Sequence, residues 1–242
     1  MLALAIIPGI ILFVIVWKFD TIEKEPPQLL AKLFVCGALT LITAVLAGFW
    51  GGRLLHFLIR DRGSIVFLFI NCFILTGLVE EGGKYIVIRL LTWKDRAFNY
   101  TFDGVVYAVT ASIGFAVAEN VMYVIRDGSN PFRVLFSVPG HVLTAVFMGY
   151  FYGLSRYEEG VGEPENVRRH TAEAIIFPAL MNGLYVICLS TKRPVYIVIF
   201  AVLEIFLFVV AARNFIRLSK NDTLIPGMEY TVAEGGSDES KM

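Results

Sequence analysis

The chain has 242 residues, of which 57% are hydrophobic, and its 21 basic residues balance its 21 acidic residues. A soluble domain of this length rarely has so large an apolar fraction, so we expect a membrane protein. The neutral charge and the lack of a basic stripe argue against nucleic-acid binding. Three cysteines, Cys36, Cys72 and Cys188, fall within apolar stretches and are expected to act as small hydrophobic residues, not as a disulfide or metal framework.

Seven apolar stretches approach the roughly 20 residues that a helix needs to cross a bilayer. They cover residues 2–19, 29–50, 64–93, 102–125, 134–154, 172–190 and 194–215. These stretches predict an all-α, polytopic membrane protein with about seven transmembrane helices, forming one domain over residues 1–217. Residues 218–242 are polar and acidic, and we expect them to form a disordered tail.

The loops between these stretches predict the orientation of the chain. Lys and Arg are more frequent in the loops on the side of the C-terminal tail than in the opposite loops. This bias predicts an external N terminus and a cytoplasmic C terminus. Residues 20–27 are interpreted as a solvated loop whose prolines start the next helix, and residues 155–171 as a cytoplasmic loop.

The third stretch places Glu80, Glu81 and Lys84 in surroundings that are almost wholly apolar. Carboxylates at bilayer depth cost a few kcal/mol each, so they mark functional sites. Glu80 and Lys84 are four residues apart and share a helix face, whereas Glu81 is rotated by about 100°. We therefore expect Lys84 to neutralise Glu80, or Glu81 in a distorted turn, and the other carboxylate to be a candidate general base. Gly82 and Gly83 would allow a helix or a substrate to approach closely.

Three later stretches add polar residues: Glu119 with Asn120, then His141, then Asn182. A lone histidine in a membrane often only bonds a neighbouring helix, but here it accompanies other polar groups. At 1.5 Å per residue, Glu119, His141 and Asn182 all lie about 9–12 Å from the external helix ends. Glu80 would lie about 24 Å deep on the same basis, unless the third helix starts above the membrane, tilts or breaks near a glycine.

Several strings in this order resemble the PrsW family of intramembrane proteases. They are Glu23-Lys24-Glu25-Pro26, Glu80-Glu81-x-x-Lys84, Phe102-Asp103-Gly104-Val105-Val106-Tyr107, Gly114-Phe115-Ala116-Val117-Ala118-Glu119-Asn120-Val121-Met122-Tyr123, and His141 followed by Met148-Gly149-Tyr150-Phe151-Tyr152-Gly153. The chain is more distantly similar to the CAAX prenyl-endopeptidases, which pair a double glutamate with histidines.

The resemblance implies hydrolysis of a membrane-anchored protein substrate, such as an anti-sigma factor, in a bacterial-type cell membrane. It implies that Glu80 and Glu81 are catalytic carboxylates, with Glu119 and His141 as their partners around an attacking water. Three residues are expected to support this centre: Lys84, Asn120 and Asn182.

The sixth stretch departs from the family pattern. The family usually has His-Gly-x-x-Asp there, whereas this chain has Asn182 and Val186 at the His and Asp positions. An asparagine can donate a hydrogen bond to an oxyanion but cannot shuttle a proton. The chain is therefore either a variant protease or an impaired pseudoprotease that acts as a membrane binding module. A proton-coupled transporter would bury similar residues, but it would more naturally show internal repeats.

The use of a metal ion stays open. The HExxH motif of many zinc proteases is absent, and His141 is the only imidazole expected at membrane depth. Glu81, Glu119 and His141 could in principle supply three ligands to zinc. A site rich in carboxylates with one histidine is a poor zinc site, so we favour a metal-free mechanism in which a glutamate and His141 activate water.

Overall fold

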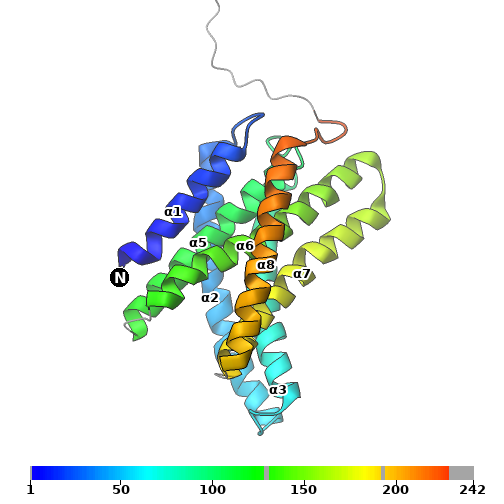
Figure 1. Ribbon diagram of the computed structural model, residues 1–242. Coiled ribbons are helices and arrows are strands. Elements are labelled where there is room, and N and C mark those ends of the chain that lie inside the picture. Colours follow the sequence, from blue (N-terminus) through cyan, green and yellow to red (C-terminus); the bar gives the residue numbers. More distant parts are fainter. Residues whose placement is uncertain (1, 128–130, 192–193, 229–242) are drawn as a thin grey trace, which may run out of the picture.

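The computed structural model describes residues 2–127, 131–191 and 194–228, and this part of the chain is mainly helical (Figure 1). The helices are α1 (Leu2–Phe19), α2 (Pro27–Leu58), α3 (Ile65–Phe69), η1 (Ile70–Leu78), α4 (Val79–Thr92), α5 (Asp103–Asp127), α6 (Pro131–Val161), α7 (Pro164–Thr191) and α8 (Pro194–Lys220). Because α3, η1 and α4 follow one another without a break, the described residues form seven helical rods.

The all-α membrane class is confirmed. Within the described ranges, four helices are long and apolar enough to cross a membrane: Pro27–Leu58, Ile65–Thr92, Asp103–Arg126 and Pro164–Cys188. In α1, residues Ile6–Phe19 form a shorter apolar helix. The count of about seven spans therefore remains a prediction.

Helix α5 packs closely against α2 because both helices carry glycine at the contact. A Cβ atom on Gly114 would lie 2.0 Å from the carbonyl oxygen of Phe34, and one on Gly37 would lie 2.1 Å from that of Ala111. Small residues let membrane helices approach until their backbones touch. The contact fixes α5, which carries Glu119, against α2.

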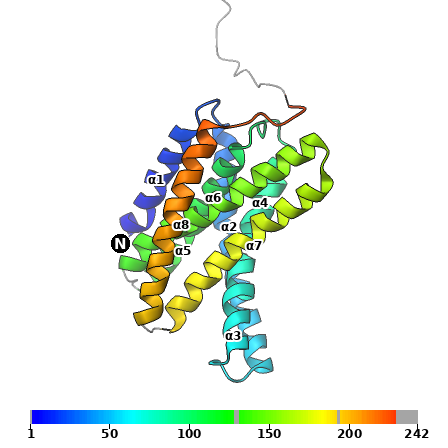
Figure 2. The same ribbon diagram turned by 45° about the vertical axis from the view of Figure 1, so that its right-hand side comes forward.

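The third rod contains a π-helix, η1, which takes more residues per turn than an α-helix. The hydroxyl of Thr76 donates to the carbonyl of Asn71, five residues earlier, at 3.1 Å. Helix α3 and the end of α2 also extend beyond the ends of the neighbouring helices (Figures 1 and 2). Because the third rod begins outside the rest of the bundle, Glu80 reaches the level of the other polar residues despite its distance from Ser64.

The polar segment 155–171 is not a loop, contrary to the sequence-based interpretation. Helix α6 continues to Val161 and α7 begins at Pro164, and the two form a hairpin that projects from the bundle (Figure 1). Gly162 makes the turn with a φ of +88°, which favours glycine, and its N–H donates to the carbonyl of Glu158 at 3.0 Å. The polar composition predicted a segment exposed to water, and exposure is compatible with a helix. The prediction was therefore wrong about the secondary structure.

The segment between α1 and α2 is a loop whose Pro27 starts α2, as predicted, but two of its acidic side chains are not solvated. Asp20 and Glu25 are only 2% and 1% exposed. Tyr107 donates to Oε2 of Glu25 at 2.5 Å, and the side-chain amide of Asn99 donates to Glu23 at 3.1 Å. Burial raises the pKa of Glu25 to about 8. Glu25 and Glu23 are held there by Tyr107 of α5 and by Asn99 in the chain just before it.

Residues 218–228 belong to the folded domain, so the predicted tail begins too early. Helix α8 ends at Lys220, and Asp222 then accepts hydrogen bonds from the backbone N–H of Phe102 at 2.8 Å and the hydroxyl of Thr101 at 3.1 Å. Ile225 is buried. Asp222 is thus held by hydrogen bonds to residues about 120 positions earlier in the chain. The composition of the segment does not reveal such long-range contacts. The rest of the predicted tail, residues 229–242, lies outside the described residues.

Candidate active site

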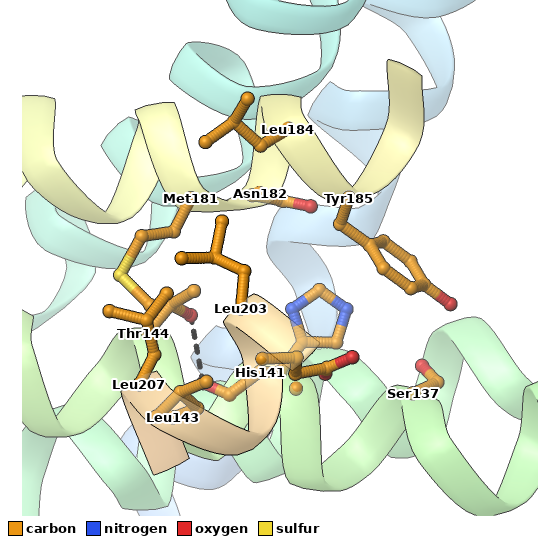
Figure 3. Close-up of a pocket in the computed structure, with 12 residues that line it drawn as sticks. Ser137, His141, Leu143, Thr144, Met181, Asn182, Leu184, Tyr185, Leu203 and Leu207 are labelled. Carbon is orange, nitrogen blue, oxygen red and sulfur yellow. Dashed lines mark hydrogen bonds between the residues drawn. The ribbon is translucent and has the colours of Figure 1, made fainter. Parts of the chain in front are cut away.

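Polar side chains from four helices meet inside the bundle. They are Glu80, Glu81 and Lys84 from α4, Glu119 from α5, His141 from α6 and Asn182 from α7. Figure 3 shows His141 and Asn182 facing one another across the gap between α6 and α7. The structure thus brings together the four residues predicted as catalytic and two of the three predicted to support them.

Lys84 forms an ion pair with Glu81 and not with Glu80. Its Nζ lies 2.8 Å from Oε1 of Glu81, and both side chains are 0% exposed. Glu81 also accepts from Asn182 at 3.2 Å and lies 3.5 Å from the hydroxyl of Thr144. Of the two adjacent glutamates, Glu81 is therefore the one whose charge Lys84 balances.

His141 is held through both ring nitrogens. Nδ1 lies 3.0 Å from Nζ of Lys84, and Nε2 lies 3.3 Å from Oε2 of Glu119. An ammonium group has only donors, so Nδ1 must accept, and Nε2 then carries a hydrogen that it donates to Glu119. The hydrogen-bond network thus assigns a neutral imidazole with its proton on Nε2. The ring also packs edge-on against Phe115, with the centroids 5.1 Å apart.

Two hydroxyl groups that the sequence analysis did not select support the centre from α6. Ser137 donates to Oε2 of Glu119 at 3.2 Å, and Thr144 donates to the carbonyl of His141 at 2.9 Å. Both lie one turn from His141 along the helix, so the spacing of four and three residues could have pointed to them.

Asn182 bridges the adjacent glutamates. Its amide nitrogen donates to Oε2 of Glu80 at 2.9 Å and to Oε1 of Glu81 at 3.2 Å. An amide carries two hydrogens, so both are used in this arrangement. Asn182 therefore holds the two carboxylates beside one another. In this arrangement its amide has no further hydrogen to donate to an oxyanion, contrary to our expectation.

The close approach that positions Asn182 occurs between η1 and α7. A Cβ on Gly77 would lie 2.3 Å from the carbonyl oxygen of Ala179, and one on Gly183 would lie 2.4 Å from the ring of Phe73. We expected Gly82 and Gly83 to allow such an approach. At Gly82 no atom lies within 4 Å of an added Cβ, and at Gly83 the nearest, from Thr40 of α2, lies at 3.5 Å, so neither glycine makes a close helix contact. Approach by a substrate at these glycines stays a prediction.

A chamber of about 580 Å³ opens beside these groups. Its polar lining residues are Thr76, Glu80, Glu119, Tyr123, Arg126, Ser137, His141, Asn182 and Tyr185, and apolar residues that include Val186 complete it. A smaller cavity of about 50 Å³ lies between α6, α7 and α8 and shares Ser137, His141, Asn182 and Tyr185 with the chamber (Figure 3). Asn120, the third predicted supporting residue, is buried and does not line the chamber.

The centre holds more acidic than basic groups. Three carboxylates, Glu80, Glu81 and Glu119, lie near Lys84, Arg126 also lines the chamber, and the hydrogen bonds assign His141 as neutral. Buried charge is costly without a partner, so an excess of carboxylates over basic groups favours protons or a cation at this centre. Glu80, Glu81 and His141 each offer a ligand atom, and these atoms lie within 4.8 Å of one another. We had predicted Glu81, Glu119 and His141 as the metal ligands. In the structure Glu80 takes the place of Glu119 in this set, and Glu119 contacts Nε2 of His141.

Comparison with known proteins identifies the family to which this centre belongs. The family model described as "PrsW family intramembrane metalloprotease" matches residues 25–212. The chain belongs to the PrsW family. The chain is 29% identical over 188 residues to Protease PrsW of Clostridioides difficile (strain 630), covering 75% of this chain and 76% of that protein.

Two other PrsW relatives give similar values. The chain is 27% identical over 186 residues to Protease PrsW of Oceanobacillus iheyensis (76% of this chain, 80% of the relative). It is 26% identical over 182 residues to that of Bacillus subtilis (strain 168), with 74% and 78% covered. No solved structure matches the chain significantly. The PrsW description as a metalloprotease favours use of a metal over the metal-free mechanism that we expected.

Proposed function

We propose that this PrsW-family protein hydrolyses a peptide bond in a membrane-anchored protein, with an anti-sigma factor as the class of substrate. The chamber is the observation that supports this most directly, because Glu80, Glu119 and His141 face one volume. About 580 Å³ is the size of a pocket that encloses part of a ligand. Family membership favours hydrolysis over a proton-coupled carrier, which buried charge alone would also fit.

In the proposed mechanism Glu80 is the general base. It lines the chamber and is partly exposed, whereas Glu81 is fully buried against Lys84. Glu80 removes a proton from water as the water oxygen bonds to the carbonyl carbon, and it returns that proton to the leaving amine nitrogen. Glu119 holds the imidazole of His141 in one orientation through Nε2.

The residues present fit a divalent metal ion, since two carboxylates and an imidazole converge and the centre has an excess of negative charge. Glu80, Glu81 and His141 would hold the ion; Glu80 would then be a ligand, and its role as free base belongs to the mechanism without an ion. When bound, such an ion polarises the peptide carbonyl and makes water a better nucleophile. Zinc is one candidate, and metal analysis of the purified protein identifies the ion.

A second candidate function is substrate binding with impaired catalysis. It is favoured by Val186, which lines the chamber where the family usually has an aspartate, and by Asn182, whose amide hydrogens are already used by Glu80 and Glu81. The double reversion Asn182→His with Val186→Asp separates the two functions. Cleavage that occurs only after reversion supports the binding module, and cleavage by the unaltered protein supports the protease.

The central test is cleavage of a membrane-tethered substrate by the full-length protein in lipid vesicles. We expect the unaltered chain to cleave it and Glu80→Gln to lose at least about 100-fold in rate, which is a usual contribution of general acid–base catalysis. Glu165→Gln removes an exposed carboxylate on α7 and is the matched control. Equal rates for Glu80→Gln and Glu165→Gln would exclude Glu80 as the base.

We also propose that the protein resides in a bacterial cell membrane with its N terminus outside and its C terminus in the cytoplasm. Ser219 near the end of α8 donates to the carbonyl of Phe19 at the end of α1, so α1 begins at the opposite end of the bundle. This supports termini on opposite sides of the membrane. Single cysteines placed near each terminus should react with an impermeant reagent only near the N terminus. The reverse pattern would contradict this orientation.

A further inference from the structure

Lys84 occupies the position between two of the three groups that would hold a metal. Its Nζ lies 2.8 Å from Oε1 of Glu81 and 3.0 Å from Nδ1 of His141, and these two acceptor atoms are 3.9 Å apart. The ammonium group also lies 4.3 Å from the centroid of the Phe115 ring. A positive charge is therefore already present in the candidate metal site.

The contacts of Lys84 use the same lone pairs that a metal needs. Nδ1 of His141 must accept from Lys84, so its lone pair points at Nζ. A metal ligand must likewise offer an unprotonated nitrogen, at about 2.0–2.1 Å for zinc. One lone pair cannot serve both cations, and Glu81 presents the same conflict through Oε1.

Charge makes the two occupants exclusive. A metal at bonding distance from Glu81 and His141 would lie close to Nζ, where two cations repel strongly because both side chains are buried. Lysine has a flexible four-carbon stem, so its ammonium group can leave without movement of the helix backbone. Glu80 does not depend on this exchange, because its hydrogen bond is to Asn182.

We propose that Lys84 is an internal cation that competes with the divalent metal for Glu81 and His141, and that it thereby sets the metal affinity of the site. The inference rests on the metal site of the proposed function. It assigns Lys84 a role beyond charge balance, because the lysine must withdraw from both ligands before the ion binds.

The test measures zinc affinity of the full-length protein in detergent, by competition with a chelator of known affinity after removal of bound metal. We expect Lys84→Met to bind zinc about tenfold or more tightly than the unaltered chain, because the competing cation is gone. The matched control Lys94→Met removes an exposed lysine just after α4 and should leave the affinity unchanged. Glu80→Gln should weaken binding with either residue at position 84. Affinity that is unchanged or weaker in Lys84→Met, or no binding by either protein, would overturn the proposal.

A folding control accompanies the affinity measurement. Lys84→Met leaves Glu81 without its cation, so thermal unfolding is recorded with and without zinc, and zinc should raise the unfolding temperature more in this variant than in the unaltered chain. If Lys84→Met does not fold, Lys84→Gln keeps a donor for Glu81 without the charge, and the same tightening is expected. Tighter zinc binding without substrate cleavage supports the competition and contradicts the proposed protease. Cleavage with no change in zinc affinity supports the protease and contradicts the competition.

Discussion

The adjacent glutamates should differ sharply in their effect on stability. Glu81→Gln removes the partner of Lys84, and both side chains are 0% exposed. Breaking a buried ion pair by removing one partner costs about 3–5 kcal/mol, because the other charge is left unpaired. Glu80→Gln retains an oxygen that can accept from Asn182, so it should cost about 1 kcal/mol or less.

These energies correspond to a measurable difference in unfolding temperature. A change of 1 kcal/mol shifts the midpoint by about 2–4 °C in a protein of 150–250 residues. We therefore expect Glu81→Gln to unfold about 6–20 °C below the unaltered chain, and Glu80→Gln within about 4 °C of it. Thermal unfolding in detergent, followed by tryptophan fluorescence, measures both variants under one condition.

The double variant Glu81→Met with Lys84→Met is the control for buried charge. Replacing a buried pair with apolar residues is often neutral or stabilising, so the double variant should recover most of the loss seen in Glu81→Gln. Equal destabilisation by Glu80→Gln and Glu81→Gln would refute the assignment of Glu81 as the buried partner of Lys84. Glu80→Gln should nevertheless lose at least about 100-fold in cleavage rate, which separates its role from folding.

Three further predictions concern other parts of the molecule. Because the pKa of Glu25 is about 8 when folded and near 4.5 otherwise, stability should fall as pH rises from 4.5 to 8, and Glu25→Gln should flatten this dependence in unfolding scans. Gly114→Ala should cost about 1–3 kcal/mol in denaturant unfolding through its clash with α2, whereas Gly52→Ala, with no atom within 4 Å of the added Cβ, should not; similar losses would contradict the close contact. Asn182→His should lower stability and alter the cleavage rate, since an imidazole cannot bridge two carboxylates with one amide group; unchanged stability would argue against the bridge.

The class of the protein and the residues of its centre could be predicted from the amino-acid sequence. Apolar stretches of bilayer length predict helices, and the costly Glu80, Glu81, Glu119 and His141 within them predict a shared site, because such residues need partners. The ordered motifs indicated the family, which the comparisons confirmed. The boundaries were less reliable where polar residues continue a helix, as in segment 155–171.

The pairing of these polar groups, in contrast, depends on how the helices pack against one another. Helix periodicity gives the face on which a side chain lies, but not the neighbour that this face meets. The π-helix η1 has more residues per turn than an α-helix, so it changes the direction in which the side chains after it point, including that of Glu80. The close contacts at Gly77 and Gly183 bring α7 near enough for Asn182 to reach both glutamates. Lys84 consequently contacts Glu81 and His141, and of the two partners that the spacing left open, Glu80 and Glu81, it pairs with Glu81. The burial of Glu25 has the same origin, since it depends on contacts with residues more than 70 positions away in the chain.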